Sequence, residues 1–212
     1  MHAGTVFIVD DDAAVCDSLA LLLGLHGFRA QSFPNAEAFL QRLDPTWRGC
    51  LLLDLRMAGM SGLELQATLA ERGIALPIII VTAHGDVATT RHALKAGAFD
   101  FVEKPIDAEH LLAVIGKAIA SDADARERTA RSEALQQRIA RLTEREHQVF
   151  ELVVAGRHNR EIAAELGISA RTVEVYKSRM MQKLQVERLP DLIRLANDLN
   201  DTSLPIRVTR TD

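Results

Sequence analysis

Five short apolar segments in the first 120 residues are separated by amphipathic helical patterns, and this alternation limits the possible fold more than any other feature. The apolar segments lie at residues 5–9, 28–33, 50–53, 78–81 and 99–102. The spacing of Val15, Leu19 and Leu22 is typical of the helices between them. Strands that alternate with helices form a parallel sheet with helices on both faces. The sequence therefore predicts an α/β domain built on a five-stranded, doubly wound parallel sheet.

The rest of the chain has no strand pattern and is predicted to form a small all-α domain of four helices. Thr143 and Glu146 have the spacing of a capping box at the start of the first helix, and Gly156 is expected to cap its end. The other helices are expected over residues 159–166, 170–184 and 189–199. We expect a first domain at residues 1–120, a helical linker at 121–140, a second domain at 141–200 and a disordered tail at 201–212.

At the end of the linker and the start of the second domain, Leu135, Ile139 and Leu142 have helical spacing. They form either an apolar seam for docking or pairing, or the beginning of the second core.

Polar side chains follow four of the five predicted strands. Asp10 and Asp11 follow the first strand, Asp54 the third, Thr82 the fourth and Lys104 the fifth. The carboxyl ends of parallel strands meet at one edge of a sheet, so these groups are expected to lie in one place. Carboxylates so close together repel one another, and Mg²⁺ suits a site with few carboxylates, several waters and a phosphate. An aspartate can carry a phosphoryl group covalently, with a hydroxyl and an ammonium as ligands for its oxygens.

Residues 5–119 resemble a receiver domain of two-component signalling in four motifs: residues 9–12 (VDDD), 54–57 (DLRM), 82–86 (TAHGD) and 104–105 (KP). The resemblance implies that Asp54 is the phospho-acceptor, assisted by Thr82 and Lys104. It implies a Mg²⁺ site of Asp10, Asp11, Asp54 and the Arg56 backbone carbonyl, the last three being direct ligands.

It further implies that Thr82 and Phe101 form the switch and that the Lys104–Pro105 peptide bond is cis. His84 and Arg56 occupy positions that tune the phosphoryl lifetime in this family. Two residues depart from the usual pattern: Ala58 stands where the family usually has proline, and Cys16 stands where it often has arginine.

Residues 159–166, 167–169 and 170–184 have the pattern of helix, tight turn and helix, which indicates a helix-turn-helix. The net charge is −4, but residues 171–183 carry four basic side chains against Glu174 alone. Residues 142–146 (LTERE), 159–163 (NREIA) and 169–175 (SARTVEV) resemble a LuxR-type DNA-binding domain. That resemblance implies base contacts from Glu174, Val175 and Ser178. It implies phosphate contacts from Arg171, Thr172, Tyr176, Lys177, Arg179 and Lys183.

The whole chain resembles the FixJ branch of the NarL/FixJ response regulators. This resemblance implies phosphorylation of Asp54 by a sensor histidine kinase, followed by binding of a homodimer to double-stranded promoter DNA. It also implies regulation of transcription, with activation through RNA polymerase expected. The protein is then a transcriptional regulator and not an enzyme. Without a signal-peptide or membrane-span pattern, and with two cysteines in no metal or disulfide spacing, we expect a cytoplasmic protein.

Three other functions compete with this interpretation. A Mg²⁺-dependent aspartyl-phosphate phosphatase would need a second aspartate two residues after Asp54, where Arg56 stands. The receiver could control DNA binding without being phosphorylated, or the C-terminal half could bind protein in place of DNA. A nucleotide-driven regulator is disfavoured, because the sequence has no glycine-rich phosphate-binding loop.

Overall fold

A computed structural model describes residues 4–83 and 87–201 of the chain. The chain divides into two compact units, Met1–Arg126 and Glu127–Asp212, which are described one at a time. Residues 202–212, which make up almost all of the predicted disordered tail, lie outside the described residues.

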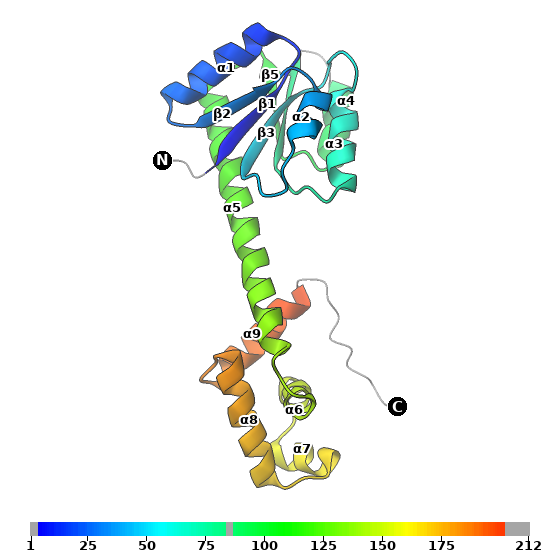
Figure 1. Ribbon diagram of the computed structural model, residues 1–212, viewed down its shortest axis with the longest axis vertical. Coiled ribbons are helices and arrows are strands. Elements are labelled where there is room, and N and C mark those ends of the chain that lie inside the picture. Colours follow the sequence, from blue (N-terminus) through cyan, green and yellow to red (C-terminus); the bar gives the residue numbers. More distant parts are fainter. Residues whose placement is uncertain (1–3, 84–86, 202–212) are drawn as a thin grey trace. The chain divides into compact units, whose positions relative to one another are not determined.

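The first unit alternates strands and helices, as Figure 1 shows. Its elements are β1 (Thr5–Val9), α1 (Ala13–Leu25), β2 (Arg29–Phe33), α2 (Ala36–Arg42), β3 (Gly49–Asp54), α3 (Gly62–Glu71), β4 (Ile78–Ala83), α4 (Val87–Lys95), β5 (Asp100–Lys104) and α5 (Ala108–Ile139). The last helix continues into the second unit, which adds α6 (Glu144–Val154), α7 (Asn159–Leu166), α8 (Ala170–Leu184) and α9 (Leu189–Asp201).

The five strands form one parallel sheet in the order β2-β1-β3-β4-β5. The predicted fold class is therefore confirmed for the first unit. Each strand lies within two residues of its predicted bounds at either end. Asp54 pairs in register with Val81, and Thr82 pairs with Glu103, so the polar strand ends lie along one edge.

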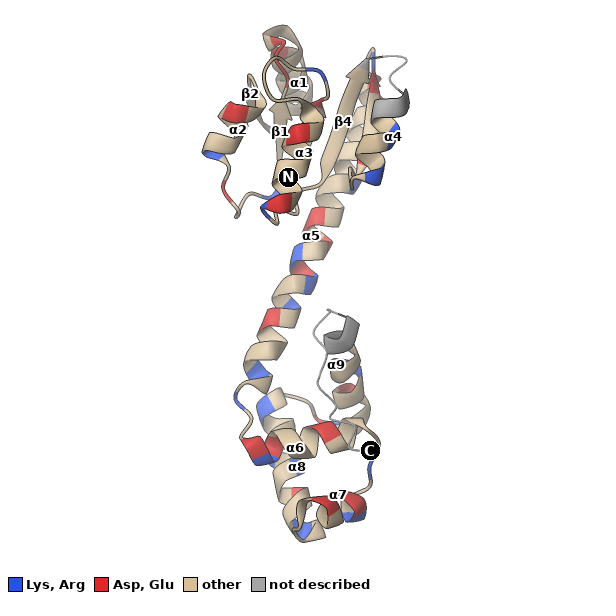
Figure 2. Cartoon of the chain, turned by 90° about the vertical axis from the view of Figure 1, so that its right-hand side faces the viewer, with Lys and Arg blue, Asp and Glu red and all other residues tan. Residues whose placement is uncertain are grey.

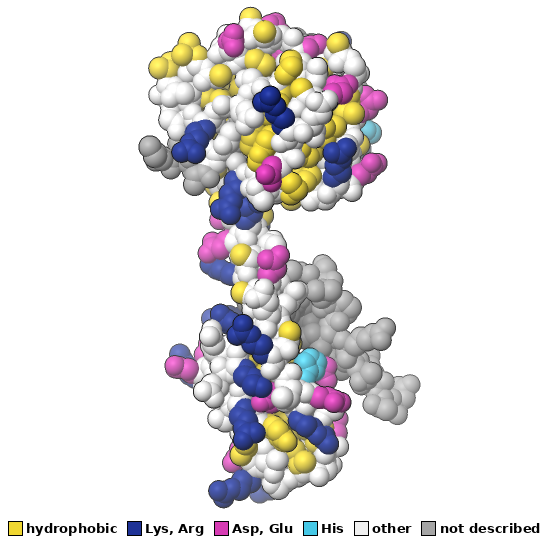
Figure 3. All heavy atoms as spheres, in the orientation of Figure 1, with side chains coloured by type: hydrophobic (Ala, Val, Ile, Leu, Met, Phe, Trp, Pro, Cys, Tyr) yellow, Lys and Arg dark blue, Asp and Glu magenta, His cyan; other side chains and the backbone are white. Residues whose placement is uncertain are grey.

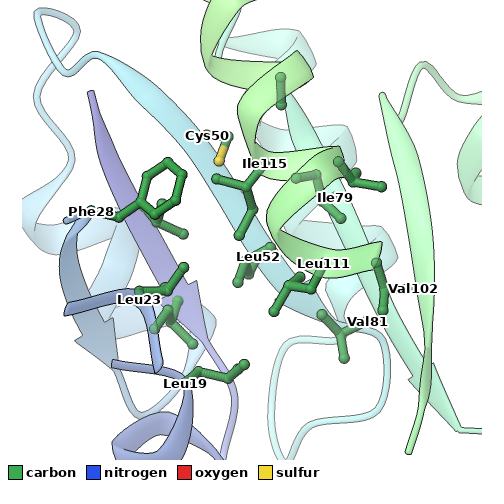
Figure 4. Packing of buried hydrophobic residues seen from close by; sticks show 14 of the residues in the cluster. Leu19, Leu23, Phe28, Cys50, Leu52, Ile79, Val81, Val102, Leu111 and Ile115 are labelled. Atoms are coloured by element: carbon green, nitrogen blue, oxygen red, sulfur yellow. The ribbon is translucent and has the colours of Figure 1, made fainter. Parts of the chain in front are cut away.

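Helices cover both faces of the sheet, and each face has its own apolar core. One core joins α1 and α5 to the sheet, and Figure 4 shows Leu23 and Phe28 on one side of it and Leu111 and Ile115 on the other. The second core lies under α2 and α3 and includes Phe39, which is fully buried. Because both faces are covered, the central strand β3 is apolar along its whole length up to Asp54.

Helix α5 is fixed to the opposite end of the sheet beyond residue 120. The buried Asp122 accepts hydrogen bonds from the backbone N–H of Gly49 (3.0 Å) and from Arg126 Nε (2.9 Å). Arg126 also donates to the backbone carbonyl of Trp47, whose ring stacks on Phe7 at a centroid distance of 4.2 Å. Residues as far as Arg126 are therefore part of the first unit, and α5 runs through the predicted linker without a break. Basic and acidic residues both occur along the later part of α5, as the blue and red segments of its ribbon in Figure 2 show.

The second unit is a small helical domain around one apolar core. Val149, Phe150, Ile162, Val173 and Leu192 are buried at its centre. Leu135, Ile139 and Leu142 pack into the same core, so they belong to this domain and do not form a separate seam.

The helix ends of this unit follow the expected capping chemistry. The capping box of Thr143 and Glu146 is present, and Ser169 accepts a hydrogen bond from Thr172 N. Gly167 ends α7 in the left-handed conformation. Ala155 is the C-cap residue of α6, and Gly156 follows it in the left-handed conformation (φ +77°) and donates its N–H to the Val153 carbonyl at 3.0 Å, so the predicted role of Gly156 in ending the helix is confirmed.

Among the described residues, no helix combines the length and the hydropathy needed to cross a membrane.

Candidate functional site

The carboxyl ends of β1, β3, β4 and β5 bring the predicted polar groups of the first unit together. Asp10 and Asp54 are nearly buried, and Thr82 at the end of β4 is buried as well. Lys104 Nζ lies 2.9 Å from Asp10 Oδ2 and 2.8 Å from Asp54 Oδ1. One ammonium therefore bridges two carboxylates that are 44 residues apart in the sequence but end neighbouring strands.

The charge on Lys104 is stabilised by this arrangement. Partial burial opposes the charged form, but the hydrogen bonds and negative charges of Asp54 and Asp10 outweigh that effect. The net result is a Lys104 pKa above its ordinary value of 10.5. The side chain keeps 29% of its surface exposed, so the ammonium is fixed in position and can still be reached from solvent.

Backbone donors hold the outer oxygens of the same carboxylates. Asp12 N donates to Asp10 Oδ1 at 2.9 Å, and Arg56 N donates to Asp54 Oδ2 at 2.7 Å. Asp11 is exposed, and its Oδ2 accepts a hydrogen bond from Ala58 N at 3.0 Å. Each of the three predicted acids is thus held in a defined orientation at one edge of the sheet.

Close packing at Gly62 sets the path of the loop that follows Asp54. A Cβ at this first residue of α3 would lie 2.3 Å from the Asp54 carbonyl oxygen, which is too close for any other residue without a backbone shift. The loop between Asp54 and Gly62 is also held by Glu37, whose Oε1 accepts from Met60 N at 3.1 Å. The path of the loop after Asp54 is therefore fixed at Met60 and at Gly62.

The acids suit a hard divalent cation, although they do not form a cluster of three ligands. Among the described residues, no group of three or more His, Cys, Asp or Glu side chains is arranged to hold a metal ion. The implied ligand set needs only two carboxylates, Asp11 and Asp54, and one carbonyl, that of Arg56. Asp10, Asp11 and Asp54 carry three negative charges against the one positive charge of Lys104, and Mg²⁺ binds through few carboxylates and several waters. The donor set therefore fits Mg²⁺.

The predicted switch residues lie on the two strands that follow β3 in the sheet. Thr82, the next-to-last residue of β4, comes directly after Val81, the register partner of Asp54. Phe101 in β5 is half-buried and packs against the core under α2 and α3. The Lys104–Pro105 peptide bond is cis, as the resemblance implies. His84, the predicted residue that tunes phosphoryl lifetime, lies outside the described residues, and Arg56 is exposed.

An open groove, which the sequence analysis did not single out, begins at Lys104. It is lined by Val15, Ser18 and Leu22 of α1 together with Pro105 and Ile106. The apolar spacing of α1 was visible in the sequence, but the meeting of α1 with the segment after β5 depends on the fold. The groove places apolar side chains of α1 beside Lys104.

The second unit contains the predicted helix-turn-helix. Helix α7, the turn at Gly167 and helix α8 follow one another, and Val173, Met180 and Leu184 bury the inner face of α8. The outer face carries the predicted DNA-contact residues. Of these, the exposed ones are Arg171, Glu174, Val175, Ser178 and Arg179, and the partly exposed ones are Thr172, Tyr176, Lys177 and Lys183. Figure 3 shows Lys and Arg side chains spread over the visible face of this unit.

Lys183 differs from the other predicted DNA contacts, because its ammonium is bound within the domain. Its Nζ lies 2.5 Å from Glu146 Oε2 and 3.2 Å from the Arg141 carbonyl oxygen. Burial opposes the charge on Glu146, but Lys183 and the donors of Thr143 outweigh it and lower the Glu146 pKa. The long-range partner of Lys183 was not visible in the sequence pattern.

Two family models match separate parts of the chain. A model described as the response regulator receiver domain matches residues 6–116. A second model, described as bacterial regulatory proteins of the luxR family, matches residues 140–196.

The chain is 45% identical over 192 residues to the transcriptional regulatory protein FixJ of Azorhizobium caulinodans, covering 90% of each sequence. The low-resolution structure of the response regulator StyR is 42% identical, with a TM-score of 0.83 and coverage of 92% of this chain and 98% of that one. The full-length FixJ structure from B. japonicum is 40% identical, with a TM-score of 0.60 and coverage of 95% and 99%.

The similarity to these proteins therefore covers both domains and nearly the whole chain. Relatives that share this arrangement are transcriptional regulators, which removes the phosphatase interpretation. The chain belongs to the response-regulator family of two-component systems that includes FixJ, in which a receiver domain precedes a LuxR-type DNA-binding domain that regulates transcription.

Proposed function

We propose that Asp54 accepts a phosphoryl group from a sensor histidine kinase, and that the phosphorylated protein binds promoter DNA as a dimer. The observation that carries this proposal is the bridge from Lys104 Nζ to Asp10 and Asp54 at the end of the sheet. A nearly buried carboxylate beside a fixed, accessible ammonium suits a nucleophile whose product is a dianion.

In the proposed transfer, a carboxylate oxygen of Asp54 attacks phosphorus of the donor phosphohistidine. The oxygen–phosphorus bond forms as the nitrogen–phosphorus bond breaks, and the imidazole leaves with the electron pair. Lys104 holds one phosphoryl oxygen, and the Thr82 hydroxyl donates to another. Asp10, Asp11, Asp54 and the Arg56 carbonyl would hold Mg²⁺, which neutralises charge on the transferring group when it is bound. The remaining requirement is in-line positioning, which the backbone donors to Asp10 and Asp54 support.

The proposed switch starts at Thr82 and Phe101. Movement of the Thr82 hydroxyl toward the new dianion leaves room for Phe101 to turn inward from its half-buried position. The surface of α4, β5 and α5 then changes and either supports dimerisation or releases the DNA-binding domain. A shift from mostly inactive to mostly active requires about 5.5 kcal/mol of differential stabilisation.

In the proposed complex, α8 lies in the major groove of promoter DNA. Glu174, Val175 and Ser178 face base edges, and the phosphate contacts come from Arg171, Thr172, Tyr176, Lys177, Arg179 and Lys183. A dimer would bind two half-sites in the cytoplasm and activate transcription through RNA polymerase. Glu174, Val175 and Ser178 are all exposed on the outer face of α8, and this exposure supports their assignment as base contacts.

The test is phosphorylation of the full chain by acetyl phosphate with Mg²⁺, followed by intact-mass measurement and light scattering. We expect one phosphoryl group and a shift to dimers in the wild type, and neither in Asp54→Asn. A variant that still gains the phosphoryl group would contradict the assignment of Asp54. Dimers and tight DNA binding without any phosphoryl group would favour control of DNA binding without phosphorylation.

A further inference from the structure

The loop after β3 carries a backbone donor that reaches the loop after β1. Ala58 N lies 3.0 Å from Asp11 Oδ2, across 47 positions of sequence. Proline has no backbone N–H, so a chain with proline at position 58 could not form this hydrogen bond.

The hydrogen bond joins the two segments that carry the expected metal ligands. Asp11 belongs to the first segment, whereas Asp54 and the Arg56 carbonyl belong to the second. Lys104 also ties the two segments together, but through Asp10 and Asp54, so it does not hold Asp11. Asp11 is the exposed member of the acid set, and exposed side chains lose conformational freedom when they bind a ligand.

The loop has other anchors, so its path does not depend on Ala58 alone. Met60 N donates to Glu37 Oε1 at 3.1 Å, and Gly62 packs against the Asp54 carbonyl. The hydrogen bond to Asp11 therefore comes from a donor on a loop that is already held in place. One oxygen of Asp11 is engaged by the N–H, and the other oxygen remains for a cation.

We propose that the backbone N–H of Ala58 is a positioning group for Mg²⁺, because it orients the Asp11 carboxylate toward Asp54 and the Arg56 carbonyl before the metal binds. The proposal rests on the proposed function, since it concerns the same metal ligands. Hydrogen-bond partners that orient metal ligands typically contribute 10–100-fold in metal affinity. An exposed partner such as this one is expected at the lower end of that range.

The experiment titrates the full, unphosphorylated chain with Mg²⁺ alone and follows backbone amide shifts by NMR at constant ionic strength. Ala58→Pro removes the donor, and Ala58→Gly keeps it while removing the side chain. We expect Ala58→Pro to weaken Mg²⁺ binding about tenfold and Ala58→Gly to stay within about twofold of the wild type. Equal affinity in the wild type and Ala58→Pro, or an equal loss in both variants, overturns the proposal.

A second variant separates the missing donor from the added proline ring. Lactic acid in place of Ala58 converts the 57–58 amide to an ester and removes the N–H while adding no ring. A loss similar to that of Ala58→Pro supports the proposal, whereas full affinity in the ester variant overturns it. The titration contains no phosphodonor, so its result is independent of whether Asp54 accepts phosphate. Failure of the proposed function would appear instead in the intact-mass measurement with acetyl phosphate.

Discussion

Two lysines, one in each unit, bind nearly buried carboxylates. Lys104 bridges Asp10 and Asp54 at the end of the parallel sheet, and Lys183 binds Glu146 in the helical domain. Their side chains are exposed to a similar degree, 29% and 35%, and each faces a carboxylate side chain that is only 4% exposed.

The two pairs differ in charge balance and in what surrounds them. Lys183 and Glu146 balance each other, and Glu146 also completes the capping box of α6. Lys104 faces two carboxylates, with Asp11 nearby as a third, so negative charge remains at the sheet edge after pairing. The balanced pair suits a structural role, whereas the uncompensated negative charge at the sheet edge suits the cation and the phosphoryl group of the proposed function. We infer that excess charge at the strand ends distinguishes the proposed chemical site from the ion pair of the helical domain.

The largest expected difference between the two lysines is in phosphoryl transfer. Lys104→Met should lower the rate of Asp54 phosphorylation by acetyl phosphate about 100-fold or more, because a preorganised positive group is lost from the reacting oxygens. Lys183→Met, the matched control, should leave that rate unchanged. The rate is measured by intact mass over time. Equal rates in the wild type and Lys104→Met would show that Lys104 does not assist the phosphorylation of Asp54.

The next effect is on the stability of the helical domain. Lys183→Met leaves the nearly buried Glu146 without its cation and should cost about 1 to 2 kcal/mol of the free energy of unfolding of this domain, because solvent screens the partly exposed Lys183. Adding Glu146→Gln removes the charge, keeps an acceptor for Thr143 N, and should restore most of the loss. Hydrogen exchange of amides in α6 and α8 of the full chain measures both changes. A double variant no more stable than Lys183→Met would show that the pairing is not the cause.

The same pairs predict stability changes at opposite ends of the pH scale. The lowered pKa of Glu146 gives a contribution to stability that is present above 4.5 and is lost as pH falls through the folded-state value. The raised pKa of Lys104 gives a contribution that is present below 10.5 and is lost as pH rises through its folded-state value.

Thermal unfolding of the wild type and Lys183→Met should therefore converge below pH 4.5, and that of the wild type and Lys104→Met should converge above pH 10.5. A stability difference that stays constant across pH would mean that the lysines act through packing and not through charge.

The smallest expected effect concerns lysine and arginine on the DNA-binding face. Arg179 is exposed on α8, whereas the Lys183 ammonium is bound to Glu146 and the Arg141 carbonyl. Arg179→Ala should reduce the slope of log affinity against log salt by about 1, as expected for one lost phosphate contact. Lys183→Gln should change that slope less. Fluorescence anisotropy at several salt concentrations gives both slopes. A larger change of slope in Lys183→Gln than in Arg179→Ala would contradict the claim that the Lys183 ammonium is held within the domain.

The sequence was sufficient to predict the groups at the sheet edge, because strand ends follow from local apolar patterns. Asp10, Asp54, Thr82 and Lys104 each stand at such an end, and the parallel topology brings them together. Periodicity also predicted the outer face of α8. It could not show that Lys183 reaches back to Glu146, because that contact spans 37 residues.

Other features were hidden from the sequence for the same reason. The linker region was predicted to be helical, but its attachment through Asp122 and Arg126 depends on Gly49 and Trp47 at the far end of the sheet. The hydrogen bond to Asp11 comes from the backbone N–H of Ala58, and side-chain patterns carry no information about which backbone donor reaches a carboxylate 47 residues away. In each case the missing information was the three-dimensional proximity of distant segments.

The most direct test of the account measures DNA affinity before and after phosphorylation of the same protein. The probe is a duplex selected from a randomised pool with the phosphorylated wild type, read by anisotropy at fixed salt. The account predicts at least about tenfold tighter binding after treatment with acetyl phosphate and Mg²⁺ in the wild type, and no change in Asp54→Asn. Equal affinity of the two phosphodonor-treated proteins would contradict the claim that Asp54 controls the DNA-binding domain.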